Sequence, residues 1–423
     1  MKTSRYTVPS MPLLVISKQV GFALSVILAF LAGTHWSLRP SVDEENDSEA
    51  PLSRFTAPVN RYGVARSEPE DFFPVSEFRQ QAAIILGCHG EINSNPQLYV
   101  EIAKAIGGRT PLFGFVSTNE QAANGVDLLR RSGLPDEAIR FVVVPSDSIW
   151  IRDYSPFMVR RQDNSISLVD ARYVPAGGQE NVRVSDDEVA SHFASMLGLP
   201  IRSMPILLDG GNLLSNGDGI VLSTALPILT NRRYGYSADQ VSDIICDMLG
   251  ARLWGYVPPL EGEPTGHIDM FATILAKNIL VLGEIDRRLD PVNSARLDLA
   301  AGNFKSMNSS LGPLQVTRIP MPPKVNNLWR SYTNVIMANG VLLMPSYSDV
   351  DREIEDKAEE IYRGLLPGWE IRRINCDTLV RRQGQLHCIS YNLPKYIDLK
   401  GLYESAYPVD PSTNTFRGMK RSS

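Results

Sequence analysis

The sequence lacks the short motifs that usually mark a bound metal, a nucleotide or a redox centre. Its four cysteines include no CxxC pair, and it contains no HExxH motif and no GxxxxGK loop, so zinc-ribbon, redox-motif and P-loop proteins are not indicated. The 42 basic and 47 acidic residues leave a net charge of −5 without a basic run, which argues against nucleic acid as the main partner. The 423 residues, 43% of them hydrophobic, suffice for one large globular domain or two smaller ones.

The first 40 residues have the pattern of an export signal or a membrane anchor. Lys2, Arg5 and Lys18 precede an apolar run from Val20 to Gly33. As a helix, this run covers roughly 20 Å, which is short of the ~30 Å hydrocarbon core and suits a secretory leader. An uncleaved anchor over residues 12–34 is the alternative. In either case we expect the rest of the chain outside the cytoplasm, in the periplasm or the extracellular space.

Composition divides the remaining chain into three parts. Residues 41–72 mix acids, serine, proline and asparagine and predict a flexible linker. Residues 73–400 alternate apolar runs with helix-period stretches and predict a folded domain, whereas residues 401–423 are expected to form a polar tail. The tripeptide Ala338-Asn339-Gly340 predicts a hairpin. Because a doubly wound parallel sheet would show fewer hairpins, we expect an α/β fold built from strand-rich modules.

The individual elements follow from apolar periodicity and turn residues. Helices are expected over residues 95–106, 119–131, 184–197, 238–249, 295–307 and 351–365. Strands are expected over residues 81–87, 110–116, 140–144, 205–208, 220–223, 268–275, 279–282, 334–337, 341–344 and 369–373.

Cys388, in the stretch from Gly384 to Ser390, is the first candidate for covalent chemistry. Interpreted as a short strand, this stretch points His387 and Cys388 in opposite directions. A base for the thiol is therefore expected from elsewhere in the chain. Taken alone, Cys388 is better interpreted as a buried structural thiol, and only its combination with the other candidate residues favours catalysis.

The stretch from Gly266 to Phe271 offers that base. An extended backbone places His267 and Asp269, two residues apart, on one face. A buried carboxylate at that position needs a cationic partner. A histidine and an aspartate at this spacing can also ligate zinc. However, the sequence offers only one well-placed histidine, and a thiolate combined with carboxylates is an uncommon set of zinc ligands. We therefore expect no metal.

Two further stretches carry polar side chains after apolar strands. Between Ser146 and Pro156, Asp153 is the candidate carboxylate, with Trp150 as an apolar wall; the alternative is a capped turn in which Arg152 pairs with a nearby acid. In the second stretch, Gly210-Gly211 permits a close backbone approach, and Asn212 offers polar support. We expect Trp150, Arg152 and Asn212 on the substrate side of the site.

One thiol, one imidazole and two carboxylates suit a planar cation. A guanidinium presents its donors in a fixed fork that carboxylates match in pairs. Asp153 and Asp269 would offset its charge and hold its central carbon against the sulfur of Cys388. A cysteine protease remains an alternative, although it would not need two additional carboxylates in its pocket.

The order of these motifs resembles the family that unites bacterial peptidylarginine deiminases with agmatine deiminases. The matching motifs are Trp150-Ile-Arg152-Asp153-Tyr-Ser-Pro156, Asp209-Gly-Gly-Asn212, Gly266-His267-Ile-Asp269, Ser331-Tyr-Thr-Asn334 and His387-Cys388-Ile-Ser390. The resemblance runs from about residue 73 to about residue 391. It implies the pentein fold, an α/β propeller of five ββαβ-like modules around a pseudo-fivefold axis.

The resemblance also implies roles for individual residues. Cys388 would attack the guanidinium carbon, while Asp153 and Asp269 hold the guanidinium nitrogens. His267 would protonate the leaving ammonia and then activate the water that hydrolyses the thiouronium intermediate. Asn334 matches a polar position near the thiol, and no cofactor or metal is implied.

The substrate beyond the guanidinium is indicated less directly. Residues 174–178 stand where agmatine deiminases carry a Trp-Gly-Gly stretch, and the N-terminal leader is unexpected for polyamine synthesis, which is a cytoplasmic task. Both features favour peptidyl-arginine or free arginine over agmatine. Transfer of the amidino group to an acceptor amine is an alternative reaction. A membrane-tethered binding protein without turnover is an alternative of a different class.

Overall fold

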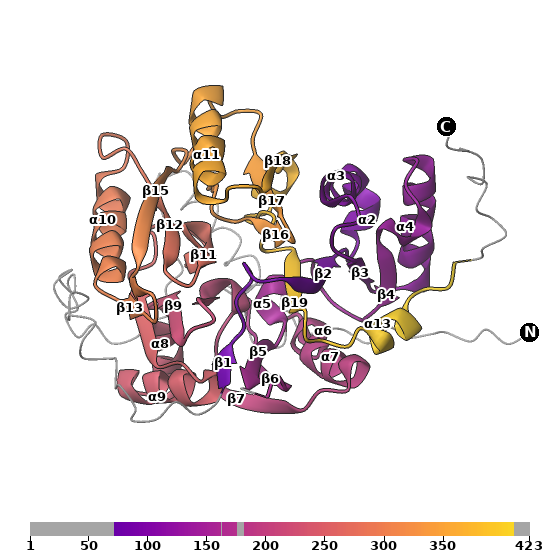
Figure 1. Ribbon diagram of the computed structural model, residues 1–423, viewed down its shortest axis with the longest axis horizontal. Helices are drawn as coiled ribbons and strands as arrows, with labels where there is room; N and C mark the ends of the chain where they lie inside the picture. Colours follow the sequence, from indigo (N-terminus) through magenta and orange to yellow (C-terminus); the bar gives the residue numbers. More distant parts are fainter. Residues whose placement is uncertain (1–71, 162, 176–181, 410–423) are drawn as a thin grey trace, which may run out of the picture. The chain divides into compact units, whose positions relative to one another are not determined.

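A computed structural model describes residues 72–161, 163–175 and 182–409 (Figure 1). The chain divides into residues 1–54 and residues 55–423, and everything described belongs to the second unit. The expected leader or anchor and the expected linker up to residue 71 lie outside the described residues, so export stays a prediction. Within the described ranges, no helix combines the length and the hydrophobicity that a membrane span requires.

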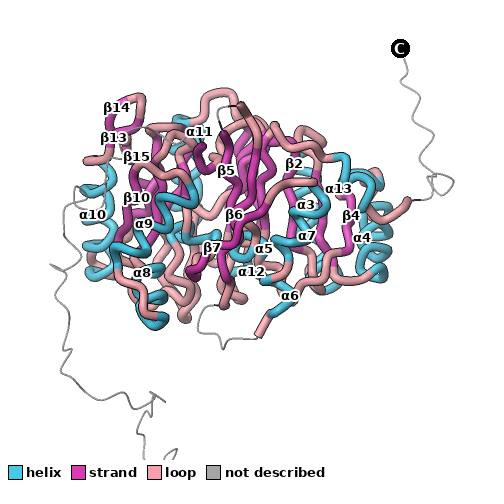
Figure 2. Tube along the Cα trace, turned by 90° about the horizontal axis from the view of Figure 1, so that it is seen from below, coloured by secondary structure: helices cyan, strands magenta, loops and turns pink. Residues whose placement is uncertain are grey.

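The described residues form five sheets of three or four strands that repeat one connection pattern. In each sheet, two strands pair antiparallel, and a later strand pairs parallel with the second of them after one or two helices. Figure 2 shows β5, β6 and β7 of one such sheet running side by side. The fold is therefore α/β with recurring ββαβ units, as the frequency of hairpin turns predicted.

The strands of the five sheets are these. One sheet holds β1 (Phe72–Pro74), β5 (Phe157–Arg161), β6 (Ile166–Arg172) and β7 (Ile201–Leu207). The next three hold β8 (Leu214–Ser215), β9 (Ile220–Thr224) and β10 (Leu253–Val257); β11 (Ala272–Ala276), β12 (Ile279–Glu284) and β15 (Gln315–Pro320); and β16 (Ile336–Ala338), β17 (Val341–Ser346) and β18 (Glu370–Asn375). The last joins β19 (Ser390–Pro394) to β2 (Gln81–Gly87), β3 (Leu112–Val116) and β4 (Arg140–Val143). A small hairpin adds β13 (Asn308–Ser309) and β14 (Gly312–Pro313).

The helices connect these strands. They are α2 (Glu91–Ser94), α3 (Pro96–Ile106), α4 (Asn119–Arg131), α6 (Val184–Asp187), α7 (Val189–Leu197), α8 (Leu226–Asn231), α9 (Ala238–Leu249), α10 (Pro291–Lys305), α11 (Arg352–Leu365), α12 (Asp377–Val380) and α13 (Lys400–Ser405). Local sequence sets several of their ends. At α9, the side chain of Ser237 accepts from Gln240 N in a capping box, and Gly250 ends the helix in the left-handed conformation.

Two strands begin later than predicted, and both differences fall at the site. After the extended residue His267, residues Ile268–Met270 form a 3₁₀ turn, and β11 begins only at Ala272. Cys388 likewise lies in a turn, and β19 begins at Ser390. The reason is hydrogen bonding: buried asparagine side chains accept the backbone N–H groups that a strand would offer to a neighbouring strand.

The C-terminal helix α13 belongs to the folded domain. Leu402 is buried, α13 packs against α7, and the ring of Tyr403 meets Phe113 edge-on at 5.2 Å. The ordered packing thus continues past residue 400, into the range expected to be a polar tail. Apolar side chains at 402 and 403 supply the contacts that hold this helix.

Candidate active site

The candidate site forms where the chain passes from one sheet to the next. A short segment that is not a strand precedes the first strand of each antiparallel pair. These segments are α5 (Ile151–Tyr154), the 3₁₀ turns η4 (Gly210–Asn212) and η6 (Ile268–Met270), residues 331–335 and residues 386–389. Each carries one of the five sequence motifs. The repeated connection pattern therefore gives all five motifs equivalent places in their sheets.

Hydrogen bonds and close packing link these five crossover segments to one another. The bonds run from Ile268 N to Asn212 Oδ1 (3.1 Å), from Thr333 Oγ1 to Asp269 O (3.2 Å), from His387 N to Asn334 Oδ1 (2.8 Å) and from Arg152 N to Cys388 O (3.2 Å). The remaining link is close packing between η4 and α5. The two backbones are so near that a Cβ added to Gly210 would overlap the carbonyl oxygen of Arg152. The segments thus close a ring of contacts, and residues up to about 240 positions apart become neighbours.

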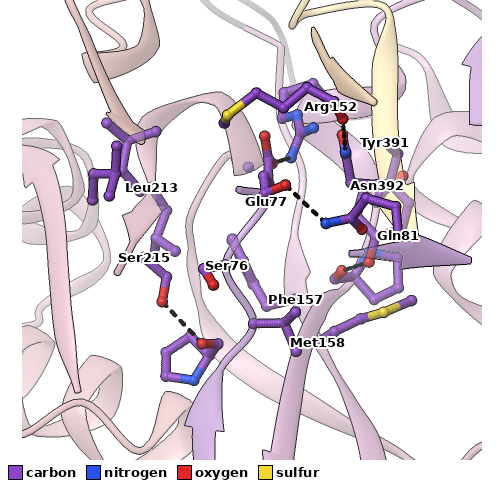
Figure 3. A pocket seen from close by; sticks show the side chains of 18 of the residues that line it. Ser76, Glu77, Gln81, Arg152, Phe157, Met158, Leu213, Ser215, Tyr391 and Asn392 are labelled. Atoms are coloured by element: carbon purple, nitrogen blue, oxygen red, sulfur yellow. Dashed lines mark hydrogen bonds and ion pairs between the residues drawn. The ribbon is translucent and has the colours of Figure 1, made fainter. Parts of the chain in front are cut away.

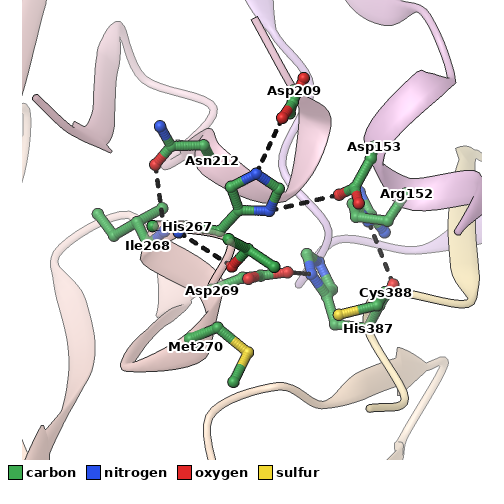
Figure 4. Close-up of polar contacts among 12 residues, drawn as sticks. Arg152, Asp153, Asp209, Asn212, His267, Ile268, Asp269, Met270, His387 and Cys388 are labelled. Carbon is green, nitrogen blue, oxygen red and sulfur yellow. Dashed lines mark hydrogen bonds and ion pairs between the residues drawn. The ribbon is translucent and has the colours of Figure 1, made fainter. Parts of the chain in front are cut away.

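His267 lies between two carboxylates (Figure 4). Its Nε2 is 3.0 Å from Asp209 Oδ2, and its Nδ1 is 3.5 Å from Asp153 Oδ1. Burial lowers the pKa of His267, but Asp153 and Asp209 outweigh burial and raise that pKa to about 10. The imidazole is therefore protonated at neutral pH and can donate a proton. Asp209 was not among the predicted site residues. Its position directly before Gly210-Gly211 was the one feature of the sequence that could have indicated it.

Gly211 lets the acidic side chains converge on His267. A Cβ at this position would lie 2.6 Å from Asp153 Oδ1, 2.7 Å from His267 Nδ1 and 3.2 Å from Asp269 Oδ2. Any larger residue would push these groups apart. The glycine pair thus serves a close approach, as expected, although the approaching groups here are the protein's own side chains.

Asp153 and Asp269 each have one buried oxygen that accepts no hydrogen bond from the described residues, although Asp153 Oδ1 faces His267 Nδ1 at 3.5 Å. Asp153 Oδ1 and Asp269 Oδ1 are buried, and neither has a hydrogen-bond partner among the described residues. Burial raises the pKa of Asp153 to about 7, and Asp209 and Asp269 reinforce that rise against the opposing effect of His267. Leaving a buried acceptor unpaired is costly. These two oxygens are therefore suited to accept hydrogen bonds from a cationic ligand.

Cys388 lies beside these carboxylates and is only 6% exposed. Burial raises the pKa of its thiol well above the usual value, and the charges of Asp269 and Asp153 raise it further. Asn334 Nδ2 lies 3.4 Å from Sγ, and Asn334 Oδ1 also accepts from Cys388 N. Asn334 therefore fixes both the backbone and the sulfur. A cation bound at the two carboxylates would reverse the local field and favour the thiolate.

His387 and Arg152 form a second charged group with Glu77, and Figure 3 shows the Glu77–Arg152 part of it. His387 Nδ1 is 2.8 Å from Asp269 Oδ2 and Nε2 is 2.9 Å from Glu77 Oε2, so both ring nitrogens donate to carboxylates. The other oxygen of Glu77 pairs with the guanidinium of Arg152. Burial raises the pKa of Glu77, but Arg152 and His387 outweigh it and lower that pKa to about 2. The sequence left open that Arg152 pairs with an acid of the protein instead of facing the substrate, and Glu77 is that acid.

The other predicted site residues support the site from its edges. Asn212 Oδ1 also accepts from Thr224 N at 2.9 Å, so this side chain holds the turn that carries His267. The half-buried ring of Trp150 packs on Gly384, where a Cβ would overlap it, and Arg382 lies 5.8 Å from the ring centre. Arg152 is engaged by Glu77 instead of facing the two free carboxylate oxygens.

Two further observations bound the site. Among the residues that the structure describes, no three His, Cys, Asp or Glu side chains are arranged to hold a metal ion. A cavity of about 70 Å³ is lined by Glu77 and Arg152, but not by Cys388 or His267 (Figure 3). The charged group around Glu77 thus borders a cavity of its own, separate from the thiol.

The chain resembles known proteins in sequence and in fold. The family model described as Porphyromonas-type peptidyl-arginine deiminase matches residues 76–394. An agmatine deiminase of Stutzerimonas stutzeri is 24% identical, over 70% of this chain and 86% of that protein. The solved agmatine deiminase of Enterococcus faecalis is 21% identical with a TM-score of 0.67, covering 79% of this chain and 99% of that one. The C. jejuni agmatine deiminase has a TM-score of 0.64 at 19% identity, covering 77% and 96%. The structural likenesses show a shared fold.

Proposed function

The chain belongs to the Porphyromonas-type peptidyl-arginine deiminase family, and on that premise we propose a covalent route by which Cys388 deiminates an arginine side chain. The overall activity is hydrolysis of a guanidino C–N bond, as in the deiminases that the chain resembles. The observation that carries the route is the pair of unpartnered buried oxygens on Asp153 and Asp269 beside a thiol. A guanidinium supplies the N–H donors that these oxygens lack.

The charge of the site supports a monocationic ligand. When both imidazoles are protonated and Asp153, whose pKa is about 7, is ionised, four carboxylates face three cations; the carboxylates are on Glu77, Asp153, Asp209 and Asp269, and the cations are on Arg152, His267 and His387. One negative charge is left over. Since uncompensated charge in a buried site is costly, a single bound guanidinium would balance it.

The reaction then proceeds in two halves. The bound cation lowers the pKa of Cys388, the thiol proton leaves to solvent, and the thiolate adds to the guanidinium carbon. The imidazolium of His267 gives its proton to one nitrogen, the C–N bond breaks, and ammonia leaves a thiouronium on Cys388. Neutral His267 then takes a proton from water as that water attacks the same carbon. Cleavage of the C–S bond and loss of the remaining hydroxyl proton to solvent release a ureido product, leaving Cys388 as the thiolate and His267 as the imidazolium.

The repeated connection pattern supports a pentein arrangement for the chain. Five sheets share the ββαβ connection, and their five crossover segments contact one another in sequence order around a closed ring. A ring of equivalent crossovers is what modules around a pseudo-fivefold axis would produce. In this arrangement, the candidate site lies on the axis because the crossovers do.

For the substrate, we favour peptidyl-arginine or free arginine. Arg183 Nη1 donates to the hydroxyl of Tyr173 at 3.1 Å. Burial, with the charges of Asp153 and Asp209, raises the pKa of Tyr173, so this tyrosine and its arginine partner stand beside the acidic site. A cation there suits a substrate that carries a carboxylate next to its guanidinium-bearing chain. Agmatine, which has no carboxylate, is the second candidate because the similar curated proteins are named agmatine deiminases.

Ammonia release from an arginyl peptide, free arginine and agmatine tests the function. The largest kcat/KM is expected for one of the two arginine substrates. Inertness toward all three would contradict the proposed activity, while a preference for agmatine would support the second candidate. Adding an acceptor amine separates hydrolysis from amidino transfer, because transfer would convert that amine into a new guanidine.

The substitution Arg183→Ala tests the basis of the substrate preference. We expect kcat/KM for a carboxylate-bearing substrate to fall about tenfold, through KM, because one charged contact is lost. Activity on agmatine should change little. The equally substituted Arg131→Ala, at an exposed position at the end of α4, is the control. Equal losses on arginine and agmatine would show that Arg183 does not read a carboxylate.

The substitution Glu77→Gln tests the charged group behind Asp269. Glu77 and Asp269 raise the pKa of His387 against burial and Arg152, so removing the Glu77 charge lowers that pKa. His387 then loses its proton at lower pH, and Asp269 loses a donor. We expect kcat/KM to fall about tenfold and the alkaline limb of its pH profile to move to lower pH. Glu77→Asp keeps the charge and should keep the limb in place; an unchanged profile in Glu77→Gln would contradict this role.

A further inference from the structure

Apart from the candidate active site, the structure contains a cavity of about 210 Å³ whose charged lining is cationic. Its lining includes Arg79, Arg160, Lys395, Ser76, Gly217 and Tyr396. These residues come from the segment after β1, from β5, from the turn before β9 and from the chain just after β19. No aspartate or glutamate belongs to the described lining.

The cations of this cavity lack acidic partners among the described residues. The guanidinium of Arg160 and the ammonium of Lys395 both lie against the ring of Tyr396, at 4.8 and 5.3 Å from its centre. Arg160 Nη1 donates to Asn164 Oδ1 at 2.8 Å, which is a neutral contact. Within the described part of the chain, no carboxylate forms an ion pair with Arg160, Lys395 or Arg79. The aromatic face offsets only part of the repulsion between these charges.

A buried hydroxyl at the wall of the cavity also lacks a partner. Ser76 is 1% exposed, and its Oγ has no hydrogen-bond partner among the described residues. Gly217, which lines the cavity, faces this atom: a Cβ at Gly217 would lie 2.6 Å from Ser76 Oγ. The missing side chain at Gly217 thus lets the chain pack closely against this hydroxyl. A buried, unpaired donor beside unpaired cations points to an acceptor that comes from outside the chain.

We propose that this cavity binds a small oxyanion, with phosphate or carboxylate oxygens as the acceptors. Arg79 and Arg160 present guanidinium forks that match such oxygens, Lys395 adds a third cation, and Ser76 Oγ donates the remaining hydrogen bond. None of these residues belongs to the guanidinium site, so the anion site is separate from it. Ser76 directly precedes Glu77, whose carboxylate holds His387, and a bound anion would therefore also order the segment that carries Glu77 (Figure 3).

Titration of the full chain with inorganic phosphate at constant ionic strength tests this site. We expect saturable binding by calorimetry, with a matching rise in Tm that sodium chloride does not reproduce. Succinate, as the second probe, shows whether carboxylate oxygens suffice. Arg160→Gln should weaken the binding about tenfold, since a charged hydrogen-bonding partner is removed.

Two further variants keep the result interpretable. Lys395→Gln changes an exposed side chain and should weaken phosphate binding even if Arg160→Gln does not fold. Arg233→Gln, an exposed arginine outside the cavity, should bind phosphate like the unsubstituted protein. The proposal is overturned if phosphate and succinate stabilise no more than chloride, or if neither Arg160→Gln nor Lys395→Gln weakens their binding.

Discussion

Replacing Cys388 with serine is expected to lower kcat by about four orders of magnitude or more while leaving the fold intact. The oxygen of serine would occupy nearly the same volume, so the contact with Asn334 survives. A hydroxyl ionises far less readily than a thiol, and in the described structure no histidine hydrogen-bonds to the Cys388 sulfur to assist it. The negative charges of Asp153 and Asp269 make that ionisation harder still. Ammonia release and the Tm of both proteins provide the measurement.

A matched control and a trapping experiment complete this test. Cys246→Ser makes the same exchange on α9, away from the crossover segments, and should keep full activity. Acid quenching during turnover, followed by mass spectrometry, should find the thiouronium adduct, which adds the mass of the substrate less ammonia, on the peptide that contains Cys388. Substantial turnover by Cys388→Ser, or an adduct on another cysteine, would show that the nucleophile has been misassigned.

Replacing Asp153 with asparagine is expected to lower kcat/KM about a thousandfold. One of the two free acceptor oxygens becomes part of a neutral amide, and the cationic ligand loses half of its charge compensation. His267 is affected as well, because Asp153 is the largest of the groups that raise its pKa to about 10. We therefore expect KM to rise, kcat to fall and the apparent pKa of the general acid to move down toward neutrality.

The pH profile distinguishes this dual role from simple disruption of the site. A purely structural defect would lower the Tm without moving the pKa seen in kcat. Asp163→Asn, an exposed carboxylate in the turn between β5 and β6, is the control and should leave both quantities unchanged. If Asp153→Asn binds substrate normally and keeps its pH profile, the guanidinium must be held elsewhere.

Local sequence was sufficient to predict much of the secondary structure. The strand over residues 81–87 and the helices over residues 119–131 and 238–249 begin and end where predicted. Their caps and apolar repeats lie within a few residues of one another, so no distant contact is needed to define them. The segment around His267 was mispredicted for the opposite reason: Asn212, 56 residues away, accepts the N–H of Ile268 that a strand would have used.

Two charged partners at the site also escaped prediction from the sequence. Asp209 contacts His267 across 58 positions, and Glu77 contacts His387 across 310. No local sequence pattern marks two residues that are so far apart in the chain as partners. An isolated Asp or Glu near an apolar stretch looks the same in the sequence whether its side chain is exposed or paired. Burial created the need for these partners, and burial is a property of the folded chain.

The sequence by itself determined which chemical groups are available: a cysteine, a histidine and acids set in five ordered motifs, each next to an apolar run. It thereby determined the class of ligand, because two carboxylates and a thiol suit a planar cation. Only the tertiary structure decided that these groups meet, that Asp153 and Asp269 keep an oxygen free, and that Arg152 is held by Glu77. The physical reason is that hydrogen bonding, charge pairing and burial depend on distances between crossover segments, and those distances arise only when the folded chain brings these segments into contact.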